Sequence, residues 1–107
     1  MSEAPKAQVL RLETLVDYQG DAVVSRQITR TDAGNVTLFS FDAGQELSPH
    51  TAPYDALAHI LEGSAEIEVA GRVMQVQAGE ALIMPANEPH AVKARQRMKM
   101  LLTMMRG

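Results

Sequence analysis

The sequence predicts an all-β domain of the sandwich or barrel class. From residue 22 onward, short stretches rich in β-branched and apolar residues are separated by turn-forming residues about every 8 to 12 positions. Within several stretches apolar and polar residues alternate, which is the pattern of a strand with one buried face. No long helical pattern interrupts this part of the chain. The 107 residues suffice for one domain with one hydrophobic core.

Residues 1–21 form a separate strand/turn segment in this prediction, in front of a barrel domain at residues 22–107. The stretch "AQVLRLETLVDYQ" alternates like a strand in its first half, whereas Leu12, Leu15 and Val16 would share a helical face. We therefore expect an N-terminal strand followed by a short helical turn.

The next elements are predicted as a hairpin, a loop and a buried strand. "AVVSRQITR" and "VTLFSFD" flank the turn-forming cluster "TDAGN", which indicates two paired strands. "AGQELSPHTAPYD" contains two prolines and reads as a loop, and the mostly apolar "ALAHILEG" follows as a strand.

The remaining sequence predicts a second hairpin, a short strand and one long strand. In "SAEIEVAGRVMQVQAGE" two alternating stretches meet at a tight turn at Ala70 and Gly71. "ALIMPANEPHAVKARQRMKMLLTMM" supplies a short apolar strand, a proline-rich loop carrying His90, and a final long strand. In that strand basic residues alternate with less polar ones, which indicates a solvated face or an anion-binding surface.

Composition narrows the classes of function. The formal net charge is -3, which argues against general nucleic-acid binding because phosphate neutralisation needs a basic field. There is no apolar run of about 18 residues and no basic-then-apolar leader, so we expect neither a membrane span nor a secretory signal, and a cytoplasmic location. Without cysteine, any metal must be held by histidine, carboxylate, carbonyl, thioether or water.

Two motifs resemble those of the small single-domain members of the RmlC-like cupin superfamily. Gly44, His50 and Gly63 match the first cupin motif, with Ala52 at its second histidine and Ala56 at its glutamate. Gly79, Pro85 and His90 match the second motif, in which Asn87 replaces a glycine and Ala94 an asparagine. The resemblance covers about residues 22–104 and implies an antiparallel jelly-roll barrel, also called a double-stranded β-helix.

The resemblance also implies a metal site with fewer protein ligands than usual. Metal-binding cupins are similar in offering three histidines and one glutamate to an ion such as Fe, Mn, Ni or Zn. Only His50 and His90 stand at such positions here. In "ALAHIL" the strand period turns His59 away if Ala56 faces the interior, so His59 is not expected as a ligand. Asp55 stands one residue before the position of the lost glutamate and is a poor substitute for it.

Three functions stay open at this point. The first is a small cupin that binds a small organic molecule in its barrel, with the two histidines as polar anchors. The second is a metal-dependent enzyme of dioxygenase or isomerase type, with His50 and His90 holding the ion, and the third is a non-catalytic sensor or accessory domain. We expect a homodimer, because small cupins commonly pair through their sheets. The predicted pocket consists of His50, Ala52, Ala56, Met84, His90 and Met98.

Overall fold

The computed structural model describes residues 3–106, and these form nine β-strands and one short 3-10 helix. In chain order the elements are η1 (Leu12–Thr14), β1 (Val23–Thr31), β2 (Gly34–Phe41), β3 (Glu46–His50), β4 (Ala56–Glu62), β5 (Ser64–Val69), β6 (Arg72–Gln77), β7 (Ala81–Met84), β8 (His90–Lys93) and β9 (Met98–Met105). No helix among the described residues is long and apolar enough to cross a membrane.

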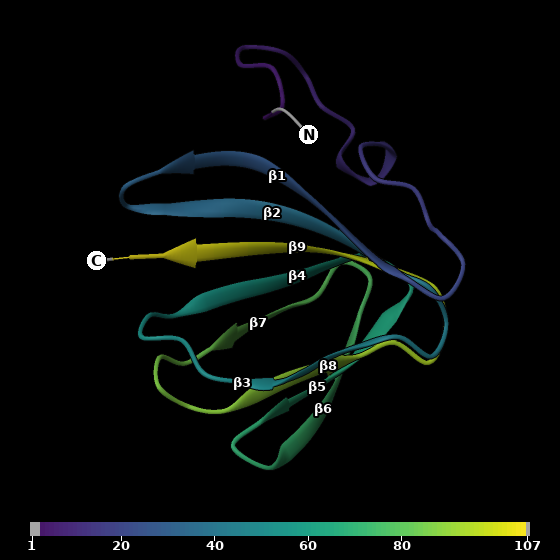
Figure 1. The fold of residues 1–107 in the computed structure, drawn as a ribbon, viewed down its shortest axis with the longest axis vertical. Coiled ribbons are helices and arrows are strands. Elements are labelled where there is room, and N and C mark those ends of the chain that lie inside the picture. The colour runs from purple at the N-terminus through teal and green to yellow at the C-terminus, as the bar shows by residue number, and fades with distance from the viewer. Residues whose placement is uncertain (1–2, 107) are drawn as a thin grey trace.

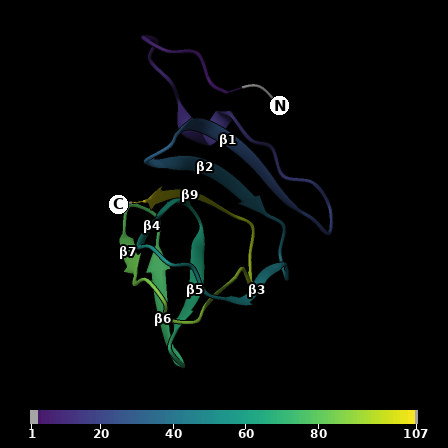
Figure 2. The same ribbon diagram turned by 60° about the vertical axis from the view of Figure 1, so that its left-hand side comes forward.

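The strands form two antiparallel sheets that face each other (Figure 1). One sheet has the order β1-β2-β9-β4-β7 and the other the order β3-β8-β5-β6. Strand β6 contacts β4 and β7, so the two sheets meet along one side, and Figure 2 shows them curving around a shared interior. The predicted all-β jelly-roll architecture is therefore confirmed.

The interior is filled by one side of each strand. In β4, buried and less buried residues alternate, and Ala56, Ala58 and Ile60 point inward as their spacing predicted. Around these three residues the core is completed by buried side chains from both sheets: Phe41, Ala65, Ile67, Val76, Met84, Val92, Ala94, Met98 and Met100.

The N-terminal segment differs from the expected strand followed by a helical turn. Its helical turn is present as η1, but residues 3–22 contain no strand. Leu10, Leu15 and Val16 pack instead on the outer face of the five-stranded sheet, in a second apolar cluster with Ile28 and Leu38. The segment is held by side-chain burial rather than by a backbone ladder, and burial alone does not require a strand.

The prediction of one long final strand is also wrong. The chain makes two strands, β8 and β9, that belong to different sheets and are joined by residues 94–97. At the crossing, Ala94 donates its N–H to the carbonyl of Gln45 at 3.0 Å, and Gly44 donates to the carbonyl of Ala94 at 2.8 Å. Because basic and less polar residues alternate without a break from Lys93 to Met100, the sequence period conceals the change of sheet.

Two turns depend on left-handed backbone. Ala70 and Gly71 have φ of 50° and 82° between β5 and β6, which is the tight turn that the sequence predicted. Gly63, with φ of 73°, separates β4 from β5. A Cβ atom at Gly63 would lie 2.4 Å from the carbonyl oxygen of Arg97, so this position excludes any side chain.

Candidate functional site

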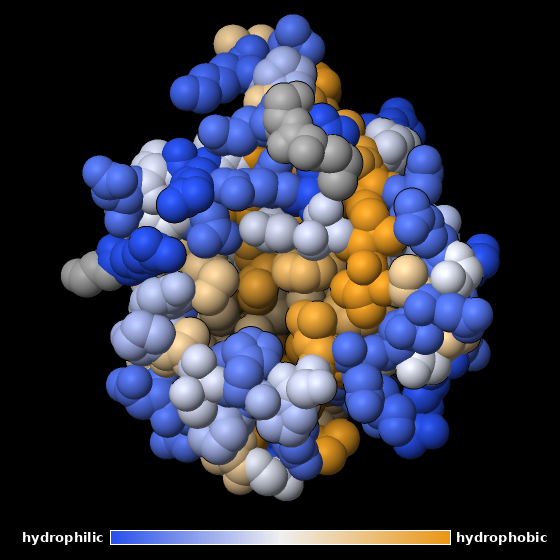
Figure 3. Space-filling view, viewed as in Figure 1, coloured by the Kyte–Doolittle hydropathy of each residue, from blue (hydrophilic) through white to orange (hydrophobic). Residues whose placement is uncertain are grey.

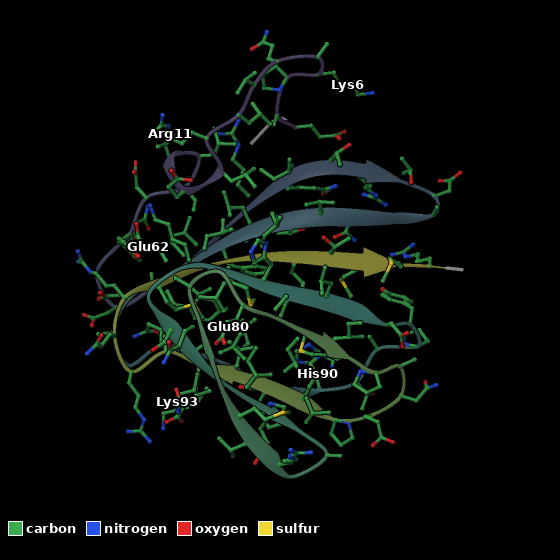
Figure 4. The ribbon with its side chains drawn as sticks, turned by 180° about the vertical axis from the view of Figure 1, so that it is seen from behind. Lys6, Arg11, Glu62, Glu80, His90 and Lys93 are labelled. Carbon is green, nitrogen blue, oxygen red and sulfur yellow. The ribbon has the colours of Figure 1, made fainter. Side chains whose placement is uncertain are left out.

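The pairing of β3 with β8 places His50 and His90 directly opposite each other. The register of these two strands shifts between Leu47 and His50, so the pairing of the two histidines depends on an irregularity that no sequence period reveals. His90 is buried at 5% exposure, while His50 is exposed. Figure 4 shows His90 at β8, in the region between β7 and the four-stranded sheet.

Two loops at the same end of the barrel support the histidine pair. Ala52, in the loop after His50, accepts a hydrogen bond from the backbone N–H of Asn87 at 2.7 Å. The carboxylate of Asp55 accepts one from the N–H of Ala86 at 2.8 Å. Asp55 therefore fastens the loop that leads to His90, which is a structural use of its carboxylate.

Asn87 takes over the backbone role of the glycine that it replaces in the second motif. Its φ is 66°, in the left-handed region that asparagine tolerates better than most residues. The departure from the motif therefore preserves the loop conformation that delivers His90.

The two imidazole rings approach each other through their Nε2 atoms. These nitrogens are 3.1 Å apart, and the ring centroids are 4.3 Å apart with an angle of 72° between the ring planes. The centroid distance lies within the separation of about 4 to 6 Å that a shared ion or its bound water requires.

The Nδ1 atom of each ring faces a backbone carbonyl oxygen. Nδ1 of His50 lies 2.8 Å from the carbonyl oxygen of Ser48, and Nδ1 of His90 lies 3.3 Å from that of Glu88. A carbonyl oxygen only accepts hydrogen bonds, so both contacts are satisfied when each Nδ1 carries the proton. In neutral rings with these tautomers both Nε2 atoms are unprotonated, and they lie 3.1 Å from each other.

Burial lowers the pKa of His90, and the neighbouring His50 ring lowers it further by charge repulsion. The backbone contact with Glu88 acts in the opposite direction. The surroundings of His90 thus favour the neutral imidazole, which is the form with a free Nε2 lone pair.

The geometry fits a shared metal ion. Two nitrogens bound to one ion through bonds of about 2.0–2.1 Å lie about 2.9 Å apart at a right angle and about 3.3 Å apart at a tetrahedral angle. The observed 3.1 Å lies between these values. Donation of each Nδ1 proton to a carbonyl is also the usual support of a histidine ligand. No group of three or more histidine, aspartate or glutamate side chains gathers here or elsewhere among residues 3–106.

The small and apolar residues of the predicted pocket divide between two ends of the barrel. Ala56, at the start of β4, pairs with Met84 of β7 on one side and with Met104 of β9 on the other. Met98 pairs with Phe41, six residues along β9 from Met104. At about 3.3 Å per residue this is roughly 20 Å away, so Met98 lies at the opposite end from Ala56.

Met104 is the residue that sequence reasoning missed. Its alternation with Leu102, Met100 and Met98 would have placed it on the inner face of the last strand. Its proximity to Ala56 follows only from the register between β4 and β9, which the sequence does not reveal.

His59 lies outside the site, as the strand period predicted. It is half-buried on the outer face of β4 and pairs with Leu101 of β9 and Ala81 of β7. The interior-facing neighbours Ala58 and Ile60 are fully buried.

The basic stretch near the C-terminus is largely neutralised by acids. Arg95 pairs with Glu66, and Arg97 pairs with Asp42 at 2.9 Å. The Lys99 ammonium lies 4.0 Å from the carboxylate of Glu62. These pairs favour the interpretation of a solvated face over that of an anion-binding surface.

Apolar surface gathers in a hollow on the face seen in Figure 3, between the two sheets. Several half-buried apolar residues pack on the core cluster from β1, β2, β3, β5, β7 and β9: Val23, Phe39, Leu47, Val69, Leu82, Leu102 and Met104. The interior of the barrel therefore presents apolar side chains with the two histidines as its polar partners on β3 and β8.

A barrel of this topology with a histidine pair on adjacent strands defines a cupin, and comparison of the sequence shows that the chain belongs to the cupin domain family, which matches residues 37–105. No curated protein matches the chain significantly.

Solved structures agree with this assignment over nearly the whole chain. A conserved protein of unknown function from Streptococcus pyogenes is 35% identical, with 100% of this chain and 96% of that chain covered and a TM-score of 0.91. A cupin superfamily protein from Desulfitobacterium hafniense is 27% identical, with coverages of 99% and 97% and a TM-score of 0.91. An RmlC-like cupin from Desulfovibrio desulfuricans is 28% identical, with coverages of 92% and 95% and a TM-score of 0.81.

Proposed function

We propose that this cupin binds one transition-metal ion through Nε2 of His50 and Nε2 of His90. The observation that carries the proposal is the 3.1 Å separation of the two Nε2 atoms, with each Nδ1 facing a backbone carbonyl oxygen that can accept its proton. A neutral pair in these tautomers has no proton between the rings. Without a shared positive centre, the two lone pairs repel each other.

The site supplies few protein ligands and leaves positions open. Since Ala52 and Ala56 carry no donor groups and Asp55 is used by the loop, the ion gains no carboxylate from these positions. When bound, such an ion supplies a Lewis acid with open coordination positions. The apolar interior of the barrel would receive the apolar part of an organic ligand.

The test is elemental analysis of protein purified without chelator and then incubated with Mn, Fe, Ni, Zn or Cu. The wild type is expected to retain about one ion per chain, and the variants His50→Ala and His90→Ala are expected to lose it. His59→Ala is the matched control, because it removes the remaining histidine from the outer face of β4 and leaves the pair intact. Metal retained by a His50→Ala/His90→Ala double variant, or a wild type that takes up no ion, would contradict the proposal.

A second candidate is binding of a small organic molecule with the histidines as polar anchors. The apolar hollow of Figure 3 favours it, because apolar lining with a few convergent polar groups is typical of small-molecule sites. Thermal-shift screening of metal-free protein tests it. Ligands that stabilise the wild type and not the double histidine variant would support this function in place of the first.

A further inference from the structure

A row of three inward-facing residues crosses the five-stranded sheet next to the histidine loops. Met104 of β9, Ala56 of β4 and Met84 of β7 are successive cross-strand partners. Directly opposite residues of antiparallel strands have Cβ atoms about 4.5–5.5 Å apart. The small Ala56 therefore stands between two thioether side chains.

Chain connectivity places this row at the end of the barrel that carries the histidines. Ala56 begins β4 directly after the loop that starts at His50, and Met84 ends β7 directly before the loop that leads to His90. The bonds from Asn87 to Ala52 and from Ala86 to Asp55 hold the two loops together. Met84 is 2% exposed and Met104 is half-buried, so both lie in the interior rather than in solvent.

The four candidate donors, two imidazoles and two thioethers, are uncharged, and the Asp55 carboxylate at this end of the barrel accepts a hydrogen bond from the N–H of Ala86. Within residues 3–106, no aspartate, glutamate or third histidine joins the imidazole pair as a metal-ligating group. A site without a carboxylate ligand favours an ion of low charge, because no negative ligand compensates a second positive charge. Thioether sulfur is a soft ligand, and soft ligands select Cu(I) over the harder divalent ions.

We propose that the site is selective for Cu(I), with the thioether sulfur of Met84, of Met104, or of both completing the coordination begun by His50 and His90. The inference rests on the proposed metal-binding function and adds the identity of the ion and two further ligands. Core packing alone does not require sulfur at these positions, because leucine has a similar volume and usually replaces methionine at a cost below about 1.5 kcal/mol. The role of sulfur can therefore be separated from that of volume.

The experiment is an anaerobic titration of metal-free protein with Cu(I) in competition with a chromophoric Cu(I) chelator. It compares the wild type with Met84→Leu, Met104→Leu and the double variant. Met98→Leu is the matched control, since Met98 faces the same interior from the same strand as Met104 but lies at the other end of the barrel. Circular dichroism confirms that each variant is folded, and X-ray absorption of the Cu(I) complex measures scattering from sulfur.

The proposal predicts a Cu–S distance of about 2.3 Å in the wild type and a loss of Cu(I) affinity of about tenfold or more in the Met84→Leu/Met104→Leu variant. Met98→Leu should bind Cu(I) as the wild type does. Wild-type affinity in the double methionine variant, or scattering from nitrogen and oxygen alone, would overturn it. In that case, loss of metal on removal of His50 and His90 would still support the two-histidine site, so the two proposals fail separately.

Discussion

The Nε2 atoms of His50 and His90 face each other at 3.1 Å across two adjacent strands, while both Nδ1 atoms face backbone carbonyl oxygens. This relationship is more informative than the presence of two histidines, because it brings the two Nε2 atoms within reach of one ion. The carbonyls of Ser48 and Glu88 each lie two residues before the histidine that they orient. Local backbone therefore sets up the site before any ligand arrives.

The tautomers are directly measurable. In metal-free protein at neutral pH, both site histidines are expected to carry their proton on Nδ1 rather than on Nε2, because each Nδ1 faces a carbonyl oxygen, which can only accept a hydrogen bond. Two-dimensional NMR that correlates ring nitrogens with ring protons distinguishes the two forms. His50→Ala and His90→Ala assign the signals. Nε2–H tautomers at both residues would show that the carbonyl contacts do not control the rings.

The Asp55 carboxylate is expected to stabilise the loop that delivers His90. Asp55→Ala leaves the N–H of Ala86 without its acceptor, at a cost of about 1 kcal/mol. Asp55→Asn keeps a carbonyl oxygen that can accept the same bond, so it should cost less. Urea unfolding measures both. Equal losses in the two variants would assign the effect to the charge of Asp55 instead of to this hydrogen bond.

Gly63 is expected to be less replaceable than Gly79, which also lies in a turn between two strands. Gly79→Ala introduces only the left-handed strain of about 1–2 kcal/mol, because nothing lies within 4 Å of the new Cβ atom. Gly63→Ala carries the same strain and also brings its Cβ atom to 2.4 Å from the carbonyl oxygen of Arg97. This overlap should cost about 1–3 kcal/mol more. Similar unfolding midpoints for the two variants would show that β9 shifts freely to admit the methyl group.

Tyr18 is expected to resist ionisation in the folded protein. Burial raises its pKa far above the ordinary value of about 10, and the hydrogen bond that its hydroxyl donates to Glu62 raises it further. Arg97, whose guanidinium lies 5.1 Å from the ring centroid, lowers the pKa by less.

A pKa raised on folding means that the stabilising contribution is present below about pH 10 and is lost as pH rises through the folded value. In a Tyr54→Phe variant Tyr18 is the one remaining tyrosine. Its absorbance near 295 nm should stay that of the neutral phenol until circular dichroism reports unfolding in alkali. Ionisation near pH 10 in a folded protein would contradict this account.

Local patterns predicted the parts of the fold that depend on local geometry. The period of β4 identified Ala56 as inward-facing and His59 as outward-facing, and the turn at Ala70 and Gly71 followed from its residue types. Both are consequences of backbone geometry over a few residues.

Features that depend on contacts between distant segments were not predictable in the same way. Basic and less polar residues alternate in the sequence from Lys93 to Met100, so nothing in this period reveals that the chain crosses between sheets at residues 94–97. Met104 and Ala56 meet only through the register of two strands far apart in sequence. The missing N-terminal strand has the same origin, because that segment is held by packed side chains and by single hydrogen bonds, such as the one from the N–H of Ala4 to the carbonyl of Ile28, rather than by a ladder.

The most direct test of the central claim is a crystal structure of the protein loaded with a transition metal, with anomalous diffraction recorded at the absorption edge of that metal. The account predicts one peak within about 2.0–2.2 Å of both Nε2 of His50 and Nε2 of His90. A peak at His59 instead, or no peak while the two rings keep their 3.1 Å contact, would contradict it.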